Sequence, residues 1–214
     1  MKAHDVLVIG AGMAGASLAW RLARDGLGVA VLEREAQPGM HSTGRSAAMF
    51  MESYGPPGVR ALTRASRDFY LHPPPGFADQ PLLAPRAALF VATTEQHASL
   101  AAMQAELEAT GTQLSLLNKE QLALVAPALK PDLFDQALLD VHGYDIDVNA
   151  MLQGFLRGAR QAGARLLTGA VPTEATRTGD AWRVTLSNGD VVQARTVVDA
   201  AGAWADEVAA LFGA

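Results

Sequence analysis

The 214-residue sequence contains no cysteine. Disulfides, thiolate ligands to a metal and a thioether link to a cofactor are therefore excluded. A protein without disulfides suits a reducing compartment, so a cytoplasmic location is the default expectation. Four of the five histidines have no partner at the spacing of a metal site, and no metal is expected.

Long apolar runs and an excess of basic residues are also lacking. No stretch reaches the roughly 18 to 20 unbroken apolar residues that a membrane-spanning helix requires, so at most peripheral contact with a membrane is expected. The run from Val6 to Trp20 resembles a signal-peptide core, but Asp5 precedes it and its glycines suit a different turn. The formal net charge is -5, and no window clusters enough Lys and Arg to bind nucleic acid.

What the sequence does contain is typical of a globular α/β protein. Half of its residues are apolar, 18% are charged and 20 are glycine. At this length about 70% of the surface of the unfolded chain can be buried, which is enough for a substantial core. We therefore expect one large domain or two small ones.

The N-terminal segment predicts a βαβ unit. Residues 6–9 are a β-branched apolar run that ends at a glycine, as in a strand buried on both faces. Apolar residues recur at helical spacing over residues 13–24, and Asp25-Gly26 ends that helix. Residues 29–32 form a second buried strand, so a parallel sheet is expected.

The rest of the chain alternates between helical and extended patterns after a loop-like stretch, residues 35–60. Asp147 is placed to cap a helix, and Asn188-Gly189 between two extended segments predicts a hairpin. Predicted helices cover residues 59–70, 95–110, 119–125 and 148–162, and predicted strands cover residues 89–92, 164–167, 182–186, 191–194 and 196–199.

The motif Gly10-Ala11-Gly12-Met13-Ala14-Gly15 stands between the first predicted strand and helix, which is the setting that a dinucleotide-binding turn requires. Gly10 permits the tight turn, Gly12 lets the backbone approach a pyrophosphate, and Gly15 lets helix and strand pack closely. Free N–H groups at the helix start attract phosphate.

Glu33 ends the second strand, where its carboxylate can accept hydrogen bonds from an adenosine ribose. A carboxylate there disfavours a 2′-phosphate, because two anions would meet, although Arg34 could pair with such a phosphate. NAD and FAD use the same first unit, so these residues alone do not choose between the two cofactors.

From Leu32 the sequence reads LEREAQPGMHSTGRSAAMF, and here the chain resembles the D-amino-acid oxidase-like family of flavoproteins, closest to the D-arginine-type D-amino-acid dehydrogenases. The resemblance implies that this stretch wraps the FAD pyrophosphate and runs beside the isoalloxazine ring. Hydroxyls and Arg45 can donate to phosphate oxygens, although Arg45 could instead pair with a carboxylate in a polar loop. The implied contacts are Ser42, Thr43, Gly44, Arg45, Ser46, Ala47, Ala48 and Met49.

The resemblance extends over essentially the whole chain, to Ala200-Ala201-Gly202-Ala203-Trp204. It places Val171 at the adenine, although an ordinary sheet residue fits there nearly as well. Tyr54 is the catalytic candidate, as a lid over the flavin or else as an ordinary loop aromatic. The expected FAD contacts outside the loop are Gly10, Gly12, Ala14, Gly15, Glu33, Arg34, Val171, Ala201, Gly202 and Trp204.

The resemblance also implies the fold class and the domains. The expected fold is α/β, a Rossmann-type FAD-binding domain with a parallel central sheet and a β-meander, plus part of an α+β substrate domain. Residues 1–84 and 143–214 would form the FAD-binding domain, and residues 85–142 the substrate-domain segment. Because family members are considerably longer, we expect a fragment, a split-gene subunit or a truncated product, with a complementing C-terminal chain as one partner.

Two departures from the family bear on the substrate. Relatives closest in the loop carry histidine where this chain has Met49, so an ionisable group beside the flavin is missing. Relatives that prefer basic substrates carry an acid after Pro-Arg-Pro, and here Pro85-Arg86 leads into Ala87. A preference for D-arginine is therefore not expected.

The reaction that the resemblance implies is oxidation of a small-molecule amine or D-amino acid. A hydride passes from the α-carbon to flavin N5, and the imine hydrolyses to an oxo acid and ammonia. The alternatives are oxidation of a 2-hydroxy acid or of glycerol 3-phosphate, and a non-catalytic FAD-binding subunit.

Overall fold

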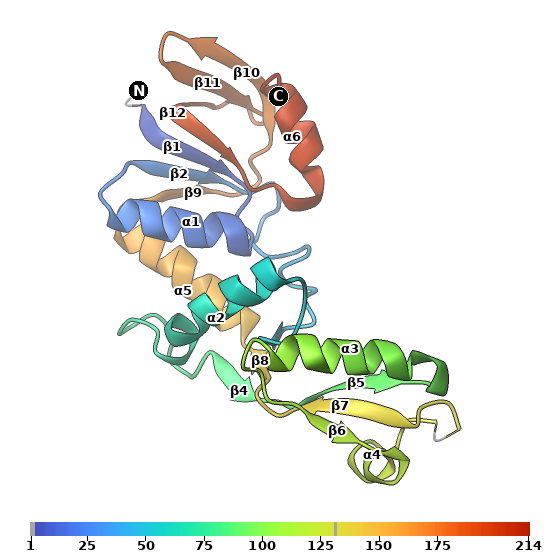
Figure 1. Cartoon of the computed structure of the whole chain (residues 1–214). Helices are drawn as coiled ribbons and strands as arrows, with labels where there is room; N and C mark the ends of the chain where they lie inside the picture. The colour runs from blue at the N-terminus through green and yellow to red at the C-terminus, as the bar shows by residue number, and fades with distance from the viewer. Residues whose placement is uncertain (1–2, 131) are drawn as a thin grey trace. The chain divides into compact units, whose positions relative to one another are not determined.

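The computed structural model describes residues 3–130 and 132–214 and divides into two compact units (Figure 1). The first unit comprises Met1–Ala47, Pro74–Gln80 and Asp147–Ala214, and the second comprises Ala48–Pro73 and Pro81–Ile146. Inside the second unit, β3 (Met49–Phe50) pairs with β8 (Tyr144–Ile146). The expected FAD-binding and substrate domains, with boundaries at residues 84 and 142, stay a prediction.

The first unit is built on a six-stranded sheet of order β10-β11-β12-β1-β2-β9. Its parallel strands are β12 (Val191–Asp199), β1 (His4–Ile9), β2 (Val29–Leu32) and β9 (Arg165–Leu167). β10 (Pro172–Thr178) and β11 (Ala181–Leu186) continue from β12 as an antiparallel meander. The expected α/β fold with a parallel sheet and a meander is confirmed.

One face of this sheet carries α1 (Met13–Arg24), and α5 (Val148–Gln161) packs against α1 (Figure 1). The two helices approach closely because α5 has glycine at the contact: a Cβ on Gly158 would lie 2.5 Å from the Trp20 ring. Trp20, Phe77 and Phe155 meet edge to face at centroid distances of 4.9 to 5.9 Å. This aromatic cluster ties residues 74–80 to the helices.

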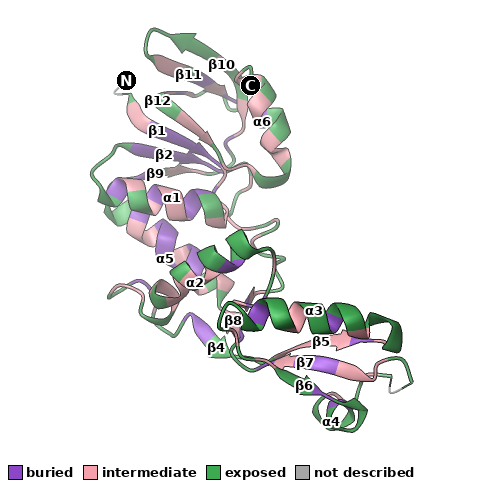
Figure 2. Cartoon of the chain, viewed as in Figure 1, coloured by how far each residue is buried: buried purple, intermediate pink, exposed green. Residues whose placement is uncertain are grey.

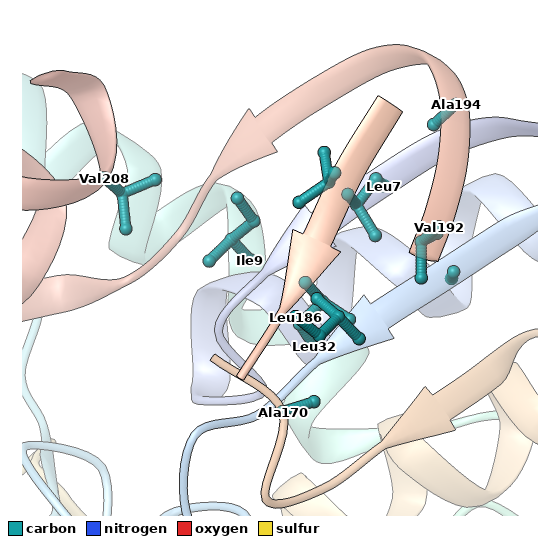
Figure 3. Packing of buried hydrophobic residues seen from close by; sticks show 10 residues of the cluster. Leu7, Ile9, Leu32, Ala170, Leu186, Val192, Ala194 and Val208 are labelled. Atoms are coloured by element: carbon teal, nitrogen blue, oxygen red, sulfur yellow. The ribbon is translucent and has the colours of Figure 1, made fainter. Parts of the chain in front are cut away.

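The other face of the sheet holds a core cluster of buried side chains (Figure 3). Side chains alternate along a strand, so Val8 of β1 faces α1 while Leu7 and Ile9 face the other way. Leu7 and Ile9 pack with Leu32, with residues of the meander, and with Val208 of α6 (Ala205–Leu211). Buried residues are accordingly dense in β1 and β2 (Figure 2).

In its described residues, the second unit contains two three-stranded antiparallel sheets and three α-helices. One sheet has the order β3-β8-β4, with β4 at Leu83–Pro85; the other has the order β5-β7-β6, with strands Ala88–Ala92, Gln136–Asp140 and Ser115–Leu117. The helices are α2 (Pro57–Leu71), α3 (His97–Glu108), which follows a 3-10 turn at Thr94–Gln96, and α4 (Lys119–Val125).

The β5-β7-β6 sheet is covered on both faces. Leu100 of α3 packs against Leu138 on one face, and Leu122 of α4 packs with Leu117 and Ala137 on the other. A buried hydrogen bond of 2.5 Å from Ser53 Oγ to Asp140 Oδ2 fixes residues 51–55 to the end of β7.

Several local predictions are confirmed. The bounds of α1, β2 and α4 match the sequence-based ranges, and Asp147 caps α5 by accepting from the Ala150 N–H at 2.8 Å. Gly189, at φ +85°, forms the predicted hairpin turn. Within the described residues, no helix combines the length and apolarity needed to traverse a bilayer.

Candidate cofactor-binding cleft

The glycine turn sits where backbone segments come into contact. Gly10 has φ +106°, and a Cβ there would lie 2.3 Å from the carbonyl oxygen of Ala200. A Cβ on Gly15 would lie 1.9 Å from the carbonyl oxygen of Gly10. Side chains are thus excluded at both positions, which confirms the predicted tight turn at Gly10 and the close helix–strand packing at Gly15.

The start of α1 is open to a ligand from the turn side. Gly12 is the N-cap residue and makes no side-chain cap. The Met13 N–H donates to Thr43 Oγ1 at 3.0 Å, and Ala14 beside it is exposed. The first N–H groups of a helix have no partner inside the helix, so this end offers donors and the positive end of the helix dipole to an anion.

Glu33 presents a fixed carboxylate next to this turn. Glu33 is 7% exposed. Its Oε2 atom accepts a hydrogen bond from the Ala11 N–H at 3.1 Å, and its Oε1 atom accepts one from the Glu35 N–H at 2.9 Å. Each carboxylate oxygen can accept a second hydrogen bond. The side chain is therefore oriented by the backbone and still able to accept from a hydroxyl.

A cleft of about 520 Å³ opens at the carboxyl ends of β1, β2 and β12. This is the edge of a parallel sheet where ligands bind, and the volume is typical of a small-molecule site. Its walls come from the turn, the end of β2, residues 39–43, residues 170–172, and the segment that leads from β12 into α6.

The cleft brings together most of the predicted contacts. Those that line it are Gly10, Gly12, Ala14, Glu33, Arg34, Ser42, Thr43, Val171, Ala201, Gly202 and Trp204. Gly15, Gly44, Arg45, Ser46 and Ala47 belong to the first unit but not to the lining, whereas Ala48, Met49 and Tyr54 belong to the second unit.

Two predicted residues have informative surroundings. Arg45 is exposed, and among the described residues no carboxylate forms an ion pair with it, so the alternative of a surface salt bridge is not realised. The Arg34 guanidinium lies 4.2 Å from the centre of the Trp204 ring, with Arg34 Nε 3.8 Å from Glu35 Oε1. Arg34 is thus held by these two neighbours rather than left as an isolated cation.

Sequence reasoning missed one wall of the cleft. Glu207, Val208 and Leu211 of α6 line it together with Met40. The sequence signal for this wall was weak, because α6 has only seven residues and the segment before it was assigned to the site by family resemblance.

The fold and the cleft together define a dinucleotide-binding protein. A family model described as "DAO: FAD dependent oxidoreductase" matches residues 5–214, and the chain belongs to this family. FAD is accordingly its cofactor. The glycine positions of the turn and the open start of α1 suit the phosphates of that cofactor, and the oriented Glu33 carboxylate suits its ribose.

Solved structures share the fold over the whole chain. Glycine oxidase from Geobacillus kaustophilus has a TM-score of 0.85 at 22% identity, over 100% of this chain and 59% of its own. L-alpha-glycerophosphate oxidase from Mycoplasma pneumoniae, with FAD bound, has a TM-score of 0.85 at 20% identity, over 99% and 57%. The amino acid oxidase NikD has a TM-score of 0.83 at 24% identity, over 100% and 55%. The chain thus spans a little over half the length of these structures.

Proposed function

We propose that FAD binds in the cleft with its pyrophosphate at the Gly10–Gly15 turn and its adenosine ribose at Glu33. The observation that carries this proposal is the meeting of an oriented carboxylate with an open helix start at one end of a parallel sheet. The turn brings its backbone close to the phosphates, and Ser42 and Thr43 line the cleft with hydroxyl groups that can donate to phosphate oxygens.

The segment after Thr43 extends this site in the proposal. Gly44, Arg45, Ser46, Ala47, Ala48 and Met49 would follow the cofactor toward its flavin end. Arg45 is exposed and makes no ion pair within the described residues, so its guanidinium is available to a phosphate oxygen. Val171, Ala201, Gly202 and Trp204 would contact the cofactor from the opposite wall.

The proposed reaction is oxidation of an amino acid or a related amine, including D-amino acids. Bound FAD supplies a two-electron acceptor that takes a hydride from the substrate α-carbon. The chain's own task is to bind and orient, and the described cleft serves the binding part of that task. Glycine oxidase and the amino acid oxidase NikD, both similar in fold, support this substrate class.

Glycerol 3-phosphate is the second candidate substrate class, because the similarity to the glycerophosphate oxidase has the same TM-score as that to glycine oxidase. Met49 and Ala87 argue against a preference for a basic side chain. We further propose that residues 1–84 and 143–214 form the FAD-binding domain and that residues 85–142 are a segment of the substrate domain. Tyr54, which is 67% exposed, would belong to a lid over the flavin.

The binding test is titration of the purified chain with FAD, monitored by quenching of flavin fluorescence, with NADH as the competing cofactor. We expect stoichiometric FAD binding that NADH does not displace. Tight NADH binding without FAD binding would refute the cofactor assignment. Reduction of bound FAD by a panel of D-amino acids, glycine and glycerol 3-phosphate then separates the substrate classes. Repeating the panel with a chain that supplies the remaining length of the relatives tests the complementing partner.

A further inference from the structure

Four side chains at the edge of the cleft form a closed ring, which we call the rim ring: Arg34, Glu35, His41 and Trp204. Arg34 lies over the Trp204 ring at 4.2 Å, and the His41 ring meets Trp204 edge to face at 4.5 Å. Glu35 Oε1 closes the ring, because it lies 2.8 Å from His41 Nε2 and 3.8 Å from Arg34 Nε. Each member therefore contacts two others.

The rim ring joins residues 34–41 to Trp204, which is far away in the sequence. Arg34 and Glu35 directly follow β2, His41 lies in the loop between β2 and β3, and Trp204 ends the 3-10 turn Gly202–Trp204 after β12. β2 and β12 are the two neighbours of β1 in the sheet. The contact between Arg34 and Trp204 therefore connects the strands on both sides of the glycine turn.

Glu35 has a different position from the other three members. Arg34, His41 and Trp204 line the cleft, whereas Glu35 does not. Glu35 contacts both Arg34 and His41, as Trp204 does, but it does so from outside the lining. A role for Glu35 at the cleft can only be exerted through the residues that it holds.

No single contact in the ring is strong. The side chains of Arg34, Glu35 and His41 are 40%, 38% and 38% exposed, and ion pairs at this exposure contribute little one by one. Their shared partners make the ring a network in which each contact orients the groups for the next. Loss of one member should then release the others.

The ring also holds the loop that carries the proposed phosphate ligands. His41 directly precedes Ser42 and Thr43, which line the cleft. Thr43 is anchored separately, since its Oγ1 accepts from the Met13 N–H at 3.0 Å. Residues 41–43 are thus fixed on one side to the start of α1 and on the other side to Trp204 and Glu35.

We propose that the rim ring is a clamp that sets the position of residues 41–43 over the cleft, with Glu35 as a positioning residue for FAD. This inference rests on the proposed function, namely that FAD binds in this cleft. The proposal has a distinctive consequence: the effects of Glu35 and Trp204 on FAD affinity should be coupled and not independent, although Glu35 does not line the cleft.

The test is a double-mutant cycle on FAD affinity with Glu35→Ala, Trp204→Leu and the double variant. The Glu35→Ala change leaves the backbone N–H that donates to Glu33 in place. We expect Trp204→Leu to weaken FAD binding about tenfold and Glu35→Ala about three- to tenfold, with the double variant within about twofold of Trp204→Leu alone. Asp25→Asn is the matched control, because it breaks an exposed ion pair of 3.1 Å with Arg21 outside the cleft lining and should leave FAD affinity unchanged.

Independent losses that multiply in the double variant, or an unchanged affinity for Glu35→Ala, would overturn the clamp. Failure of the wild-type chain to bind FAD would instead refute the proposed function, so the two failures are distinguishable. The midpoint of thermal unfolding is recorded for each variant. If Trp204→Leu does not fold, His41→Asn replaces it in the same cycle, with the same non-additive outcome expected.

Discussion

At the scale of single residues, Glu33 is a cleft residue whose side chain has a well-defined orientation. It is nearly buried, and two backbone N–H groups fix its carboxylate. A hydrogen bond to a charged acceptor contributes about 1.5 to 3 kcal/mol, so Glu33→Gln should weaken FAD binding about tenfold or more. The measurement is the FAD dissociation constant by fluorescence quenching, and a value equal to that of the wild type would remove Glu33 from the site.

The residues of the glycine motif could be predicted from the sequence, because their roles are local. Gly10 takes a positive φ of +106° in the turn itself, and a Cβ on Gly15 would lie 1.9 Å from the carbonyl oxygen of Gly10 in the same motif. The meeting of Arg34 with Trp204 could not be predicted in this way. It joins the end of β2 to the segment after β12, and the chain order does not show that β12 is the other neighbour of β1.

At the scale of elements, the contact between α1 and α5 depends on glycine. A Cβ on Gly158 would lie 2.5 Å from the Trp20 ring, which is itself packed against Phe77 and Phe155. Gly158→Ala should therefore destabilise the fold by about 1 to 3 kcal/mol through overpacking, partly offset by the better helix propensity of alanine. Chemical denaturation measures the change in the free energy of unfolding.

Gly58 in α2 provides the control for that substitution. A Cβ there would meet no atom within 4 Å, so Gly58→Ala should be neutral or stabilising by up to about 1 kcal/mol. Equal effects of the two substitutions would show that helix propensity, and not the packing of Trp20, decides the outcome at Gly158.

A second element-scale prediction concerns the junction of the 3-10 turn at Thr94–Gln96 with the segment before β7. Hydrogen bonds from Thr94 Oγ1 at 2.7 Å and from His97 Nε2 at 2.6 Å hold the pKa of Asp135 below its usual value. A carboxyl with a lower pKa in the folded state adds stability above about pH 4, and this stability is lost as the pH falls through the folded-state pKa.

The pKa of Asp135 can be measured by NMR titration of its side-chain carbon. It should lie below about 3.9 in the wild type and move toward that value in Thr94→Ala, which removes the larger of the two effects. An Asp135 titration that does not respond to Thr94→Ala would refute this account.

The elements that the sequence did not predict have identifiable causes. β10 carries the polar sequence PTEATRT and is an edge strand that pairs only with β11, so no apolar alternation identifies it. β12 was expected as two segments, because Arg195 interrupts the apolar pattern. It is one strand that pairs with β11 in its first part and with β1 in its second, and Arg195 forms an ion pair with Asp5.

At the scale of the whole molecule, the division into two units predicts that FAD binding stabilises mainly the residues around the cleft. The cleft is lined only by residues of the first unit. A ligand that binds only the folded state stabilises it by about 2.7 kcal/mol when its concentration is 100 times the dissociation constant. Saturating FAD should therefore slow hydrogen exchange most strongly in the amides that surround the cleft.

Hydrogen–deuterium exchange followed by mass spectrometry can resolve this pattern by segment. We expect FAD to protect peptides that cover residues 9–14, 33–43 and 200–204, because these segments line the cleft and their amides open only when the ligand leaves. Peptides from β5, β6 and β7 provide the comparison, since all three strands lie in the second unit. Protection confined to the strands of the second unit would contradict the cleft as the FAD site, whereas protection of residues 41–43 that disappears in Glu35→Ala would tie the rim ring to the same binding event.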